Sequence, residues 1–291
     1  MSITGAWLRG YRKIRRVAAC DLLLASKFRY LLDLEAGFFF PATLKGYREY
    51  RMQGDISVAL RENSTDGKVF EEIFIEKTYA PHARAVPRKA PVILIDLGAN
   101  IGLSAIALAR ELQPLAIVAV EPDRGNFALL RENLRRAKLE ERYAALQAFA
   151  GVERGFAELV DSGNGAWGMR MGAAASTGIP VLPIEHIISM AEGMAGATSL
   201  APLTTVVKCD IEGAEAQLFR RLHQWEDRVH YVILELHTEF LSVGDFHACL
   251  AGSRYHWRMD GTIPAGAVLA VVGLERLELK AAAQSRRAAG S

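Results

Sequence analysis

Four acidic side chains in this sequence each stand at the end of a short, largely apolar run. They are Asp96, Glu121, Asp210 and Glu235. Such runs are typical of parallel strands that are buried on both faces. In open α/β sheets, ligands bind beyond the carboxyl ends of these strands, so the four carboxylates are predicted to meet at one site. A carboxylate there can accept hydrogen bonds from sugar hydroxyls or take a proton from a reacting group.

A glycine-containing loop follows the first of these runs, residues 92–95, and precedes a helical pattern. It holds Gly98, Asn100 and Gly102. Glycine adopts positive φ and lets backbone pass close to a ligand. The dinucleotide fingerprint fails because its third glycine position is Leu103, and no Gly-Lys-Ser or Gly-Lys-Thr follows for a P-loop. The loop therefore predicts a different nucleotide-like ligand, with a tight connection that binds nothing as the alternative.

The position of Glu121 also suits a nucleoside. It lies 19 residues after Gly102, at the predicted end of the second strand. There it can accept hydrogen bonds from both ribose hydroxyls while the glycine loop lies beneath the rest of the ligand. NAD-binding proteins place a carboxylate similarly, so the glycine spacing is what argues against NAD. A structural alternative is a carboxylate stabilised by the N-terminus of the next helix.

The composition sets limits on the class of protein. The 291 residues are 51% hydrophobic and carry 35 basic and 33 acidic side chains, so no bulk charge indicates a nucleic-acid partner. Cys20, Cys209 and Cys249 are far apart and fit neither a metal motif nor a disulfide framework, which favours a reducing compartment. No apolar run reaches the roughly 18 residues of a membrane span, and the N-terminus lacks a signal-peptide pattern. We expect a cytoplasmic protein.

The elements that must position these residues alternate as strands and helices from residue 89 onward. This alternation predicts an α/β domain with a mostly parallel sheet and helices on both faces. The predicted strands are 92–95, 116–120, 143–149, 179–182, 204–209, 229–236, and a closing pair at 255–259 and 268–272. Residues 151–179 break the pattern and predict a hairpin or flap over the sheet edge. A helix over 184–191 is followed by a predicted linker over 192–202.

The domain organisation follows from a proline-rich basic segment that ends near residue 88. We expect an extension of helices and short strands over 1–88, a core domain over 89–279 and a disordered tail over 280–291. Within the extension, residues 47–61 predict one or two short strands around Gly54.

A helix after those strands is predicted to carry Val69, Phe70, Ile73 and Phe74 and to end near Tyr79. Thr65 or Asp66 is expected to cap it, because a side-chain oxygen there can accept from the first free N–H groups.

The basic stretch at residues 8–16, which includes Arg9 and Arg12, has two interpretations. It could lie on a membrane surface as part of an amphipathic helix. We favour a helix packed on the domain through nearby leucines, which are Leu22, Leu23, Leu24 and Leu31.

As a set, these motifs resemble the FkbM family of methyltransferases. The matching pieces are 61–79, 95–103, 121–133, 208–215 and 235–237, so the resemblance covers about residues 55–240. Its most specific element is Lys-x-Asp-x-Glu-Gly-x-Glu at 208–215, where Cys209 departs from the more usual aliphatic residue. The resemblance implies a class I methyltransferase fold, S-adenosylmethionine as cofactor, and O-methyl transfer to a small molecule, sugar or glycolipid. The predicted cofactor contacts are Asp96, Gly98, Ala99, Asn100, Ile101, Gly102, Glu121, Pro122, Ala148, Phe149 and Asp210.

Methyl transfer to a hydroxyl requires help with its proton, because an alcohol does not ionise unaided at neutral pH. Asp210 is the best-placed base, since its strand is expected beside the cofactor strand; a helix N-cap is its alternative role. Glu235 and His237 are two residues apart and can share a strand face, so His237 is a second candidate, oriented by a carboxylate. Lys208 is expected to pair with a carboxylate. Asp210 and Glu212 suit a divalent ion, but no third ligand is evident, so no metal site is predicted.

Three other functions remain open. An N-methyltransferase or a protein methyltransferase would use the same fold, and a non-catalytic module would bind the nucleotide without turnover. A dinucleotide oxidoreductase is opposed by the missing glycine. We expect a small-molecule or glycan acceptor and no nucleic-acid partner. Membrane association is the less favoured alternative, and the oligomeric state is not predicted.

Overall fold

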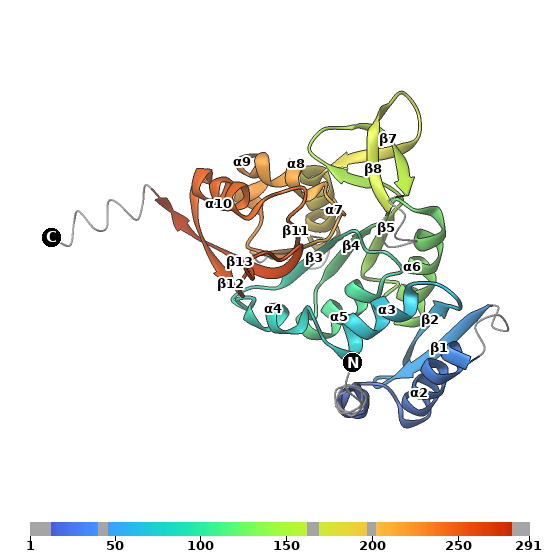
Figure 1. Ribbon diagram of the computed structural model, residues 1–291. Helices are drawn as coiled ribbons and strands as arrows, with labels where there is room; N and C mark the ends of the chain where they lie inside the picture. Colours follow the sequence, from blue (N-terminus) through green and yellow to red (C-terminus); the bar gives the residue numbers. More distant parts are fainter. Residues whose placement is uncertain (1–12, 40–45, 162–168, 197–201, 281–291) are drawn as a thin grey trace.

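A seven-stranded sheet forms the centre of the molecule. The computed structural model describes residues 13–39, 46–161, 169–196 and 202–280, and within them the sheet has the order β12-β13-β11-β10-β3-β4-β5 (Figure 1). β13 is antiparallel to both of its neighbours, and the other pairs are parallel. When the seven strands are renumbered 1 to 7 along the chain and the sheet is followed from β5 to β12, the order is 3-2-1-4-5-7-6. The fold is therefore the Rossmann-like class I methyltransferase fold, as predicted. The strands are β3 (Val92–Leu97), β4 (Ala116–Val120), β5 (Tyr143–Leu146), β10 (Thr204–Cys209), β11 (Tyr231–His237), β12 (Tyr255–Asp260) and β13 (Leu269–Leu279).

Helices cover both faces of this sheet, which explains why the inner strands are apolar throughout. Alternate residues of β3 belong to two different hydrophobic clusters: Leu94 to one, Ile93 and Ile95 to the other. The first cluster includes α4 (Ala80–Ala85), α5 (Leu103–Leu112) and α6 (Arg124–Arg136). The second includes α7 (Ile184–Gly196), α8 (Glu215–Arg220), α9 (Leu222–Trp225) and α10 (Val243–Gly252).

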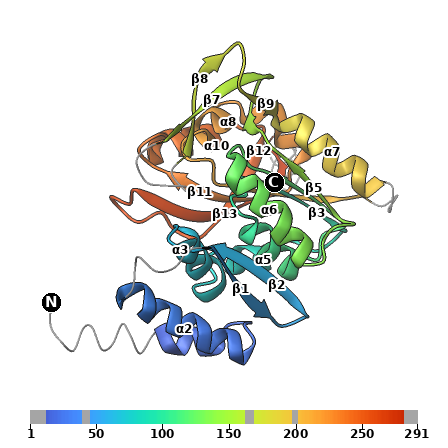
Figure 2. The ribbon, with the colours of Figure 1, turned by 90° about the vertical axis from the view of Figure 1, so that its right-hand side faces the viewer.

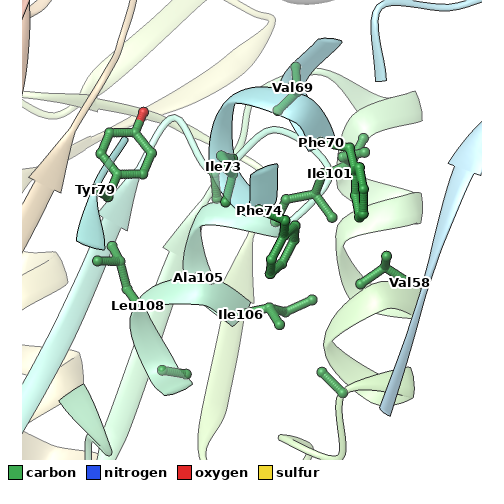
Figure 3. Close-up of a cluster of buried hydrophobic side chains, with 14 of the residues drawn as sticks. Val58, Val69, Phe70, Ile73, Phe74, Tyr79, Ile101, Ala105, Ile106 and Leu108 are labelled. Carbon is green, nitrogen blue, oxygen red and sulfur yellow. The ribbon is translucent and has the colours of Figure 1, made fainter. Parts of the chain in front are cut away.

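The N-terminal region packs against the first of these layers. It comprises α2 (Leu24–Phe39), β1 (Tyr47–Met52), β2 (Ile56–Arg61), α3 (Asp66–Phe70) and a π-helical segment, η1 (Glu71–Ile75). Figure 3 shows Phe70 and Phe74 beside Ile101 of the glycine loop and Ile106 of α5. Buried Asn133 of α6 accepts from the N–H of Ala59 at 2.7 Å. It also donates to the carbonyl oxygens of Ala59 and Ile101 at 3.1 and 2.9 Å. β2 is thus tied to the glycine loop of the core.

Two details of this region differ from expectation. The predicted helix ends at Ile75 rather than near Tyr79, and its second half is π-helical. Its cap is also different: Thr65 makes no side-chain capping bond, and Asp66 instead accepts three hydrogen bonds from Arg61. The charged guanidinium is the stronger donor, so it takes the carboxylate oxygens that a cap would have used.

The hairpin predicted within residues 151–179 is confirmed: β7 (Gly155–Asp161) pairs antiparallel with β8 (Met169–Ala175), and both belong to a second sheet. The third strand ends at Leu146 instead of Phe149, because the chain then leaves the main sheet and Phe149 pairs with Val181. The second sheet has the order β6-β9-β7-β8, from β6 (Phe149–Gly151), β7 (Gly155–Asp161), β8 (Met169–Ala175) and β9 (Ile179–Pro183). Figure 2 shows β7 and β8 above the main sheet, at the opposite end from α2.

Other boundaries also shift. Helix α7 continues to Gly196, five residues past the prediction, because Ala191 and Ala195 lie one turn apart and are both buried. Residues 229 and 230 precede β11, and β13 extends to Leu279 through its pairing with β11 and β12.

Of the leucines expected to pack the N-terminal helix, Leu22 is buried and Leu31 contacts the core. Leu23 and Leu24 are 43% and 83% exposed. In the described part of the chain, no helix is long and apolar enough to cross a membrane. Arg9, Arg12 and residues 281–291 lie outside the described residues.

Candidate active site

A pocket opens where β3, β4, β10 and β11 end. Most of the side chains predicted from the sequence line it, and Met171 of β8 closes one side. The predicted residues in its lining are Gly98, Ala99, Asn100, Glu121, Pro122, Ala148, Phe149, Asp210 and Glu235. Asp96 and His237 lie behind the lining. Ile101 is buried in the hydrophobic core and Gly102 packs against Leu130, so both support the loop from below.

The glycine loop is bent by residues with left-handed backbone. Gly98 has φ +72°, Asn100 +49° and Gly102 +87°. The N–H groups of Gly98 and Ala99 both donate to the carbonyl oxygen of Val120, at 3.0 and 2.9 Å. A Cβ on Gly98 would lie 1.7 Å from the carbonyl oxygen of Asp210, so no larger residue fits there. This contact places the glycine loop directly beside Asp210.

Glu121 is held in place by the same loop. Its Oε2 accepts from the N–H of Asn100 at 2.9 Å, and its Oε1 from the N–H of Asp123 at 2.9 Å. Burial raises the pKa of Glu121 to about 7, although these hydrogen bonds oppose the shift. The N-cap of α6 is Asp123, which accepts from Asn126, so Glu121 is not the helix cap. Its carboxylate remains on the pocket wall.

A buried ion pair lies beneath the pocket. Asp96 is fully buried; its Oδ2 accepts from the hydroxyl of Ser104 at 2.6 Å, and its Oδ1 lies 3.4 Å from Nζ of Lys208. Lys208 also donates to the carbonyl of Gly98 at 2.9 Å and to Asp210 at 3.3 Å. Burial lowers the pKa of Lys208, but attraction to Asp96 and Asp210 outweighs it and leaves the pKa well above its usual value. Lys208 therefore pairs with carboxylates, as expected, and stays charged.

His237 is oriented by the carboxylate of Glu215, which the sequence indicated only as the last residue of the motif at 208–215. Its Nδ1 lies 2.9 Å from Oε1 of Glu215, which is fully buried, and its backbone N–H donates to the same oxygen. Its Nε2 lies 3.5 Å from Oε2 of Glu212. Burial lowers the pKa of His237, but the bond and charge of Glu215 dominate and raise the pKa to about 9.

Carboxylates crowd the other half of the pocket. Buried Glu235 accepts from the hydroxyl of Tyr79 at 2.9 Å, and burial together with the charges of Asp210 and Glu72 raises its pKa to about 8. Burial and Asp210 likewise raise the pKa of Glu212 to about 7. This half can therefore store protons or bind a cation.

The sequence interpretation missed Glu72, Tyr79 and Met171. Glu72 lies in a segment that carries the family resemblance, but its helical pattern gave no reason to expect it at the site. In the sequence, Tyr79 is marked only as the predicted end of a helix. Met171 reaches the pocket because it lies on a strand of the second sheet. Their contacts cross between distant elements, which local patterns do not record.

No family model matches the sequence, and no curated protein matches it. Among solved structures, a putative rRNA methylase from Clostridium thermocellum is 10% identical, with 70% of this chain and 96% of that chain covered and a TM-score of 0.43. An O-methyltransferase from Bacillus cereus in complex with SAH is 12% identical, with 70% and 78% covered and a TM-score of 0.38. M. jannaschii TYW2 in complex with AdoMet is 12% identical, with 81% and 88% covered and a TM-score of 0.39. The fold assignment above rests on the strand order and not on these likenesses.

Proposed function

We propose that this chain is an S-adenosylmethionine-dependent methyltransferase of the FkbM type. We further propose that it methylates a hydroxyl of a small molecule, sugar or glycolipid. The observation that carries the proposal is the direct contact between the glycine loop and Asp210. Because Gly98 touches the backbone of Asp210, a ligand cradled by the loop has its reacting end next to a row of proton-accepting groups.

The residues on the loop side fit the cofactor. The carboxylate of Glu121 stands where ribose hydroxyls would donate, and Asn100 has a buried Oδ1 without a hydrogen-bond partner in the described structure. An unsatisfied buried acceptor is costly, so the amide oxygen of Asn100 favours a ligand that carries a donor. The cofactor supplies a methyl group on a sulfonium, and the protein aligns it with the acceptor.

Asp210 is the base in this proposal. Both nitrogens of His237 face carboxylates, Glu215 and Glu212, so the imidazole is held as a cation and has no free lone pair for a proton. Glu235 already accepts from Tyr79. Asp210 lines the pocket and accepts only one hydrogen bond, from Lys208, in the described structure. Its carboxylate is thus placed to take the hydroxyl proton as the O–C bond forms.

The charge of the pocket limits the acceptor. Glu72, Asp210, Glu212 and Glu235 line it, against a single lining cation, Lys208, among the described residues. A nucleic acid would need a basic groove for its phosphates, so this pocket opposes such a substrate. The same excess of carboxylates makes an amine the second candidate acceptor, because an ammonium would be attracted to it.

The test uses Asp210→Asn. For a hydroxyl acceptor, kcat should fall about 100-fold or more, because the proton has lost its acceptor. The affinity for S-adenosylmethionine, measured by calorimetry, should change only a few-fold. The acceptor is first identified by incubating the protein with labelled cofactor and a cell extract. An amine acceptor would leave most of the activity in Asp210→Asn. Binding of NAD but not S-adenosylmethionine would refute the proposal, and tight binding without any turnover would indicate a non-catalytic module.

A further inference from the structure

Three potential metal ligands from two strand ends meet on the acceptor half of the pocket. Ligand atoms of Asp210, Glu212 and His237 all lie within 4.8 Å of one another. Asp210 and Glu212 follow β10, and His237 ends β11, the neighbouring parallel strand. The sequence supplied the two carboxylates, and the third ligand becomes evident only when these strands are aligned.

The imidazole of His237 is oriented as it is in many metal sites. Its Nδ1 is fixed by Glu215, which has no exposed surface, and the ring thereby presents Nε2 to Glu212. His237 itself is only 9% exposed, and Nε2 makes no hydrogen bond among the described residues, although it faces Glu212 at 3.5 Å. A metal-binding histidine typically donates its other nitrogen to such a carboxylate, which sets both the tautomer and the ring direction. Glu215 is therefore a positioning residue for Nε2.

The carboxylates of Asp210 and Glu212 have oxygens that are available to bind an ion. Asp210 uses one oxygen for Lys208, and within the described structure its Oδ1 makes no hydrogen bond. Lys208 cannot neutralise the cluster alone, because it also holds Asp96 and the carbonyl of Gly98. Among the described residues, Glu212 has the imidazole at 3.5 Å opposite its carboxylate, and the charge of Arg170, which pairs with Glu239, also acts on it. One more positive charge between these groups would relieve the repulsion among carboxylates that line a partly enclosed pocket.

We propose that Asp210, Glu212 and His237 bind a divalent first-row transition metal ion. The ion replaces the proton on Nε2 of His237, which is released to solvent, so the imidazole that is a cation without the ion becomes a neutral ligand. Two carboxylates and one imidazole suit Mn²⁺, Fe²⁺, Co²⁺ or Zn²⁺ better than Mg²⁺, which prefers oxygen ligands. Three protein ligands leave coordination positions open, as catalytic metal sites require.

The role of the ion rests on the proposed function. A bound ion would act as a Lewis acid and would lower the pKa of a nearby acceptor hydroxyl, so that its proton would leave more readily. The O–H bond breaks and the proton passes to Asp210, while the new O–C bond forms and the C–S bond breaks. Asp210 then needs to be only a weak base.

Metal binding is tested with Mn²⁺ as the probe, on full-length protein stripped with a chelator. Loss of the free Mn²⁺ signal in electron paramagnetic resonance reports binding without any need for turnover. We expect one Mn²⁺ per chain with a Kd in the micromolar range. His237→Gln and Glu212→Gln should each weaken binding by more than about 10-fold, and Glu215→Gln by about 10-fold through loss of the ring orientation.

A matched control is His247→Gln, which removes an exposed histidine from α10 and should leave Mn²⁺ affinity unchanged. Glu212 is the more exposed ligand, so its variant should fold even if the variants at buried Glu215 or His237 do not. Absence of saturable Mn²⁺ binding by the wild-type chain, or equal affinity in Glu212→Gln and wild type, would overturn the site.

Failure of the site and failure of the proposed function give different results. Mn²⁺ binding with these losses but no methyl transfer would retain the site and reject the activity. If the protein binds no Mn²⁺ and chelation leaves methyl transfer unchanged, the proposed activity is retained and the metal site is rejected.

Discussion

The two halves of the pocket are built on different electrostatic principles. On the cofactor side, formed by residues 98–100 and Glu121, backbone N–H groups satisfy the one carboxylate and fix the loop. On the acceptor side, formed by Glu72, Asp210, Glu212 and Glu235, burial and the nearby charge of Asp210 raise the pKa of the three glutamates. Backbone hydrogen bonds hold the first half in place, whereas the second would gain stability from a proton or a cation. Recognition of the cofactor and activation of the acceptor can therefore be disturbed separately.

The largest effect is expected from Gly98→Ala, which would disturb both halves at once. The added Cβ would lie 1.7 Å from the carbonyl oxygen of Asp210, and the residue would keep a positive φ. We expect cofactor affinity to fall more than about 100-fold and the free energy of unfolding to fall by about 3 kcal/mol or more. Calorimetry and denaturant unfolding measure the two quantities.

Gly67→Ala is the matched control, because a Cβ there meets open space within helix α3. Its unfolding free energy should stay the same or rise by up to about 1 kcal/mol. Normal cofactor binding by Gly98→Ala would show that the loop is not rigid, and the contrast between the two halves would lose its basis.

The next largest effect concerns Glu121 alone. Its charged form is the better acceptor for ribose hydroxyls, and its pKa in the free protein is about 7. Affinity for S-adenosylmethionine should therefore rise between pH 6 and pH 8. In Glu121→Gln the affinity should be about 10- to 100-fold lower at pH 8, since a bond to a charged group is worth about 1.5–3 kcal/mol. The variant should also lose this pH dependence.

Asp123→Asn provides the control, because it changes an adjacent carboxylate that caps α6 and leaves Glu121 in place. It should change stability by no more than about 0.5 kcal/mol, because Asn caps a helix about as well as Asp, and it should keep the pH dependence of binding. An unchanged pH dependence in Glu121→Gln would assign the titration to another group.

Burial of Glu121 also predicts how stability responds to pH. Its pKa is raised from 4.5 to about 7 on folding, so its contribution is fully present below pH 4.5 and is lost as pH rises through 7. Between pH 5 and pH 8 the free wild-type protein should lose about 2 kcal/mol more unfolding free energy than Glu121→Gln. Denaturant unfolding at the two pH values gives the difference. A larger loss in the variant would contradict the burial argument.

The same contrast explains what the sequence could predict. The cofactor side is local, because the strand, the glycine loop and Glu121 are adjacent in the chain or one βα unit apart. Motif and spacing therefore predicted a mostly parallel sheet and the meeting of Gly98, Asn100 and Glu121 at one pocket. The interior strands were predictable because they are continuously apolar.

The acceptor side is not local. Tyr79 and Glu72 come from the N-terminal region and Met171 from the second sheet, and each reaches the pocket through tertiary packing. Glu215 was visible as a motif residue, but its bond to His237 depends on the alignment of β10 with β11. Periodicity reports which face of an element is buried and not which distant side chain it meets. For the same reason, the sequence did not indicate His237 as the third ligand of the proposed metal ion.

The smallest effect is expected from Tyr79→Phe, which tests how much the acceptor side depends on a neutral donor. The Tyr79 hydroxyl donates to Glu235 at 2.9 Å, and both residues are buried. Without it a buried carboxylate oxygen loses its donor, so we expect the free energy of unfolding at pH 7 to fall by about 1–2 kcal/mol. Tyr143→Phe, whose 3.5 Å contact is exposed, should change it by no more than about 0.5 kcal/mol. Equal losses in the two variants would mean that the carboxylates of the acceptor side do not need the donor. The proton that Glu235 retains would then be enough to stabilise that half of the pocket.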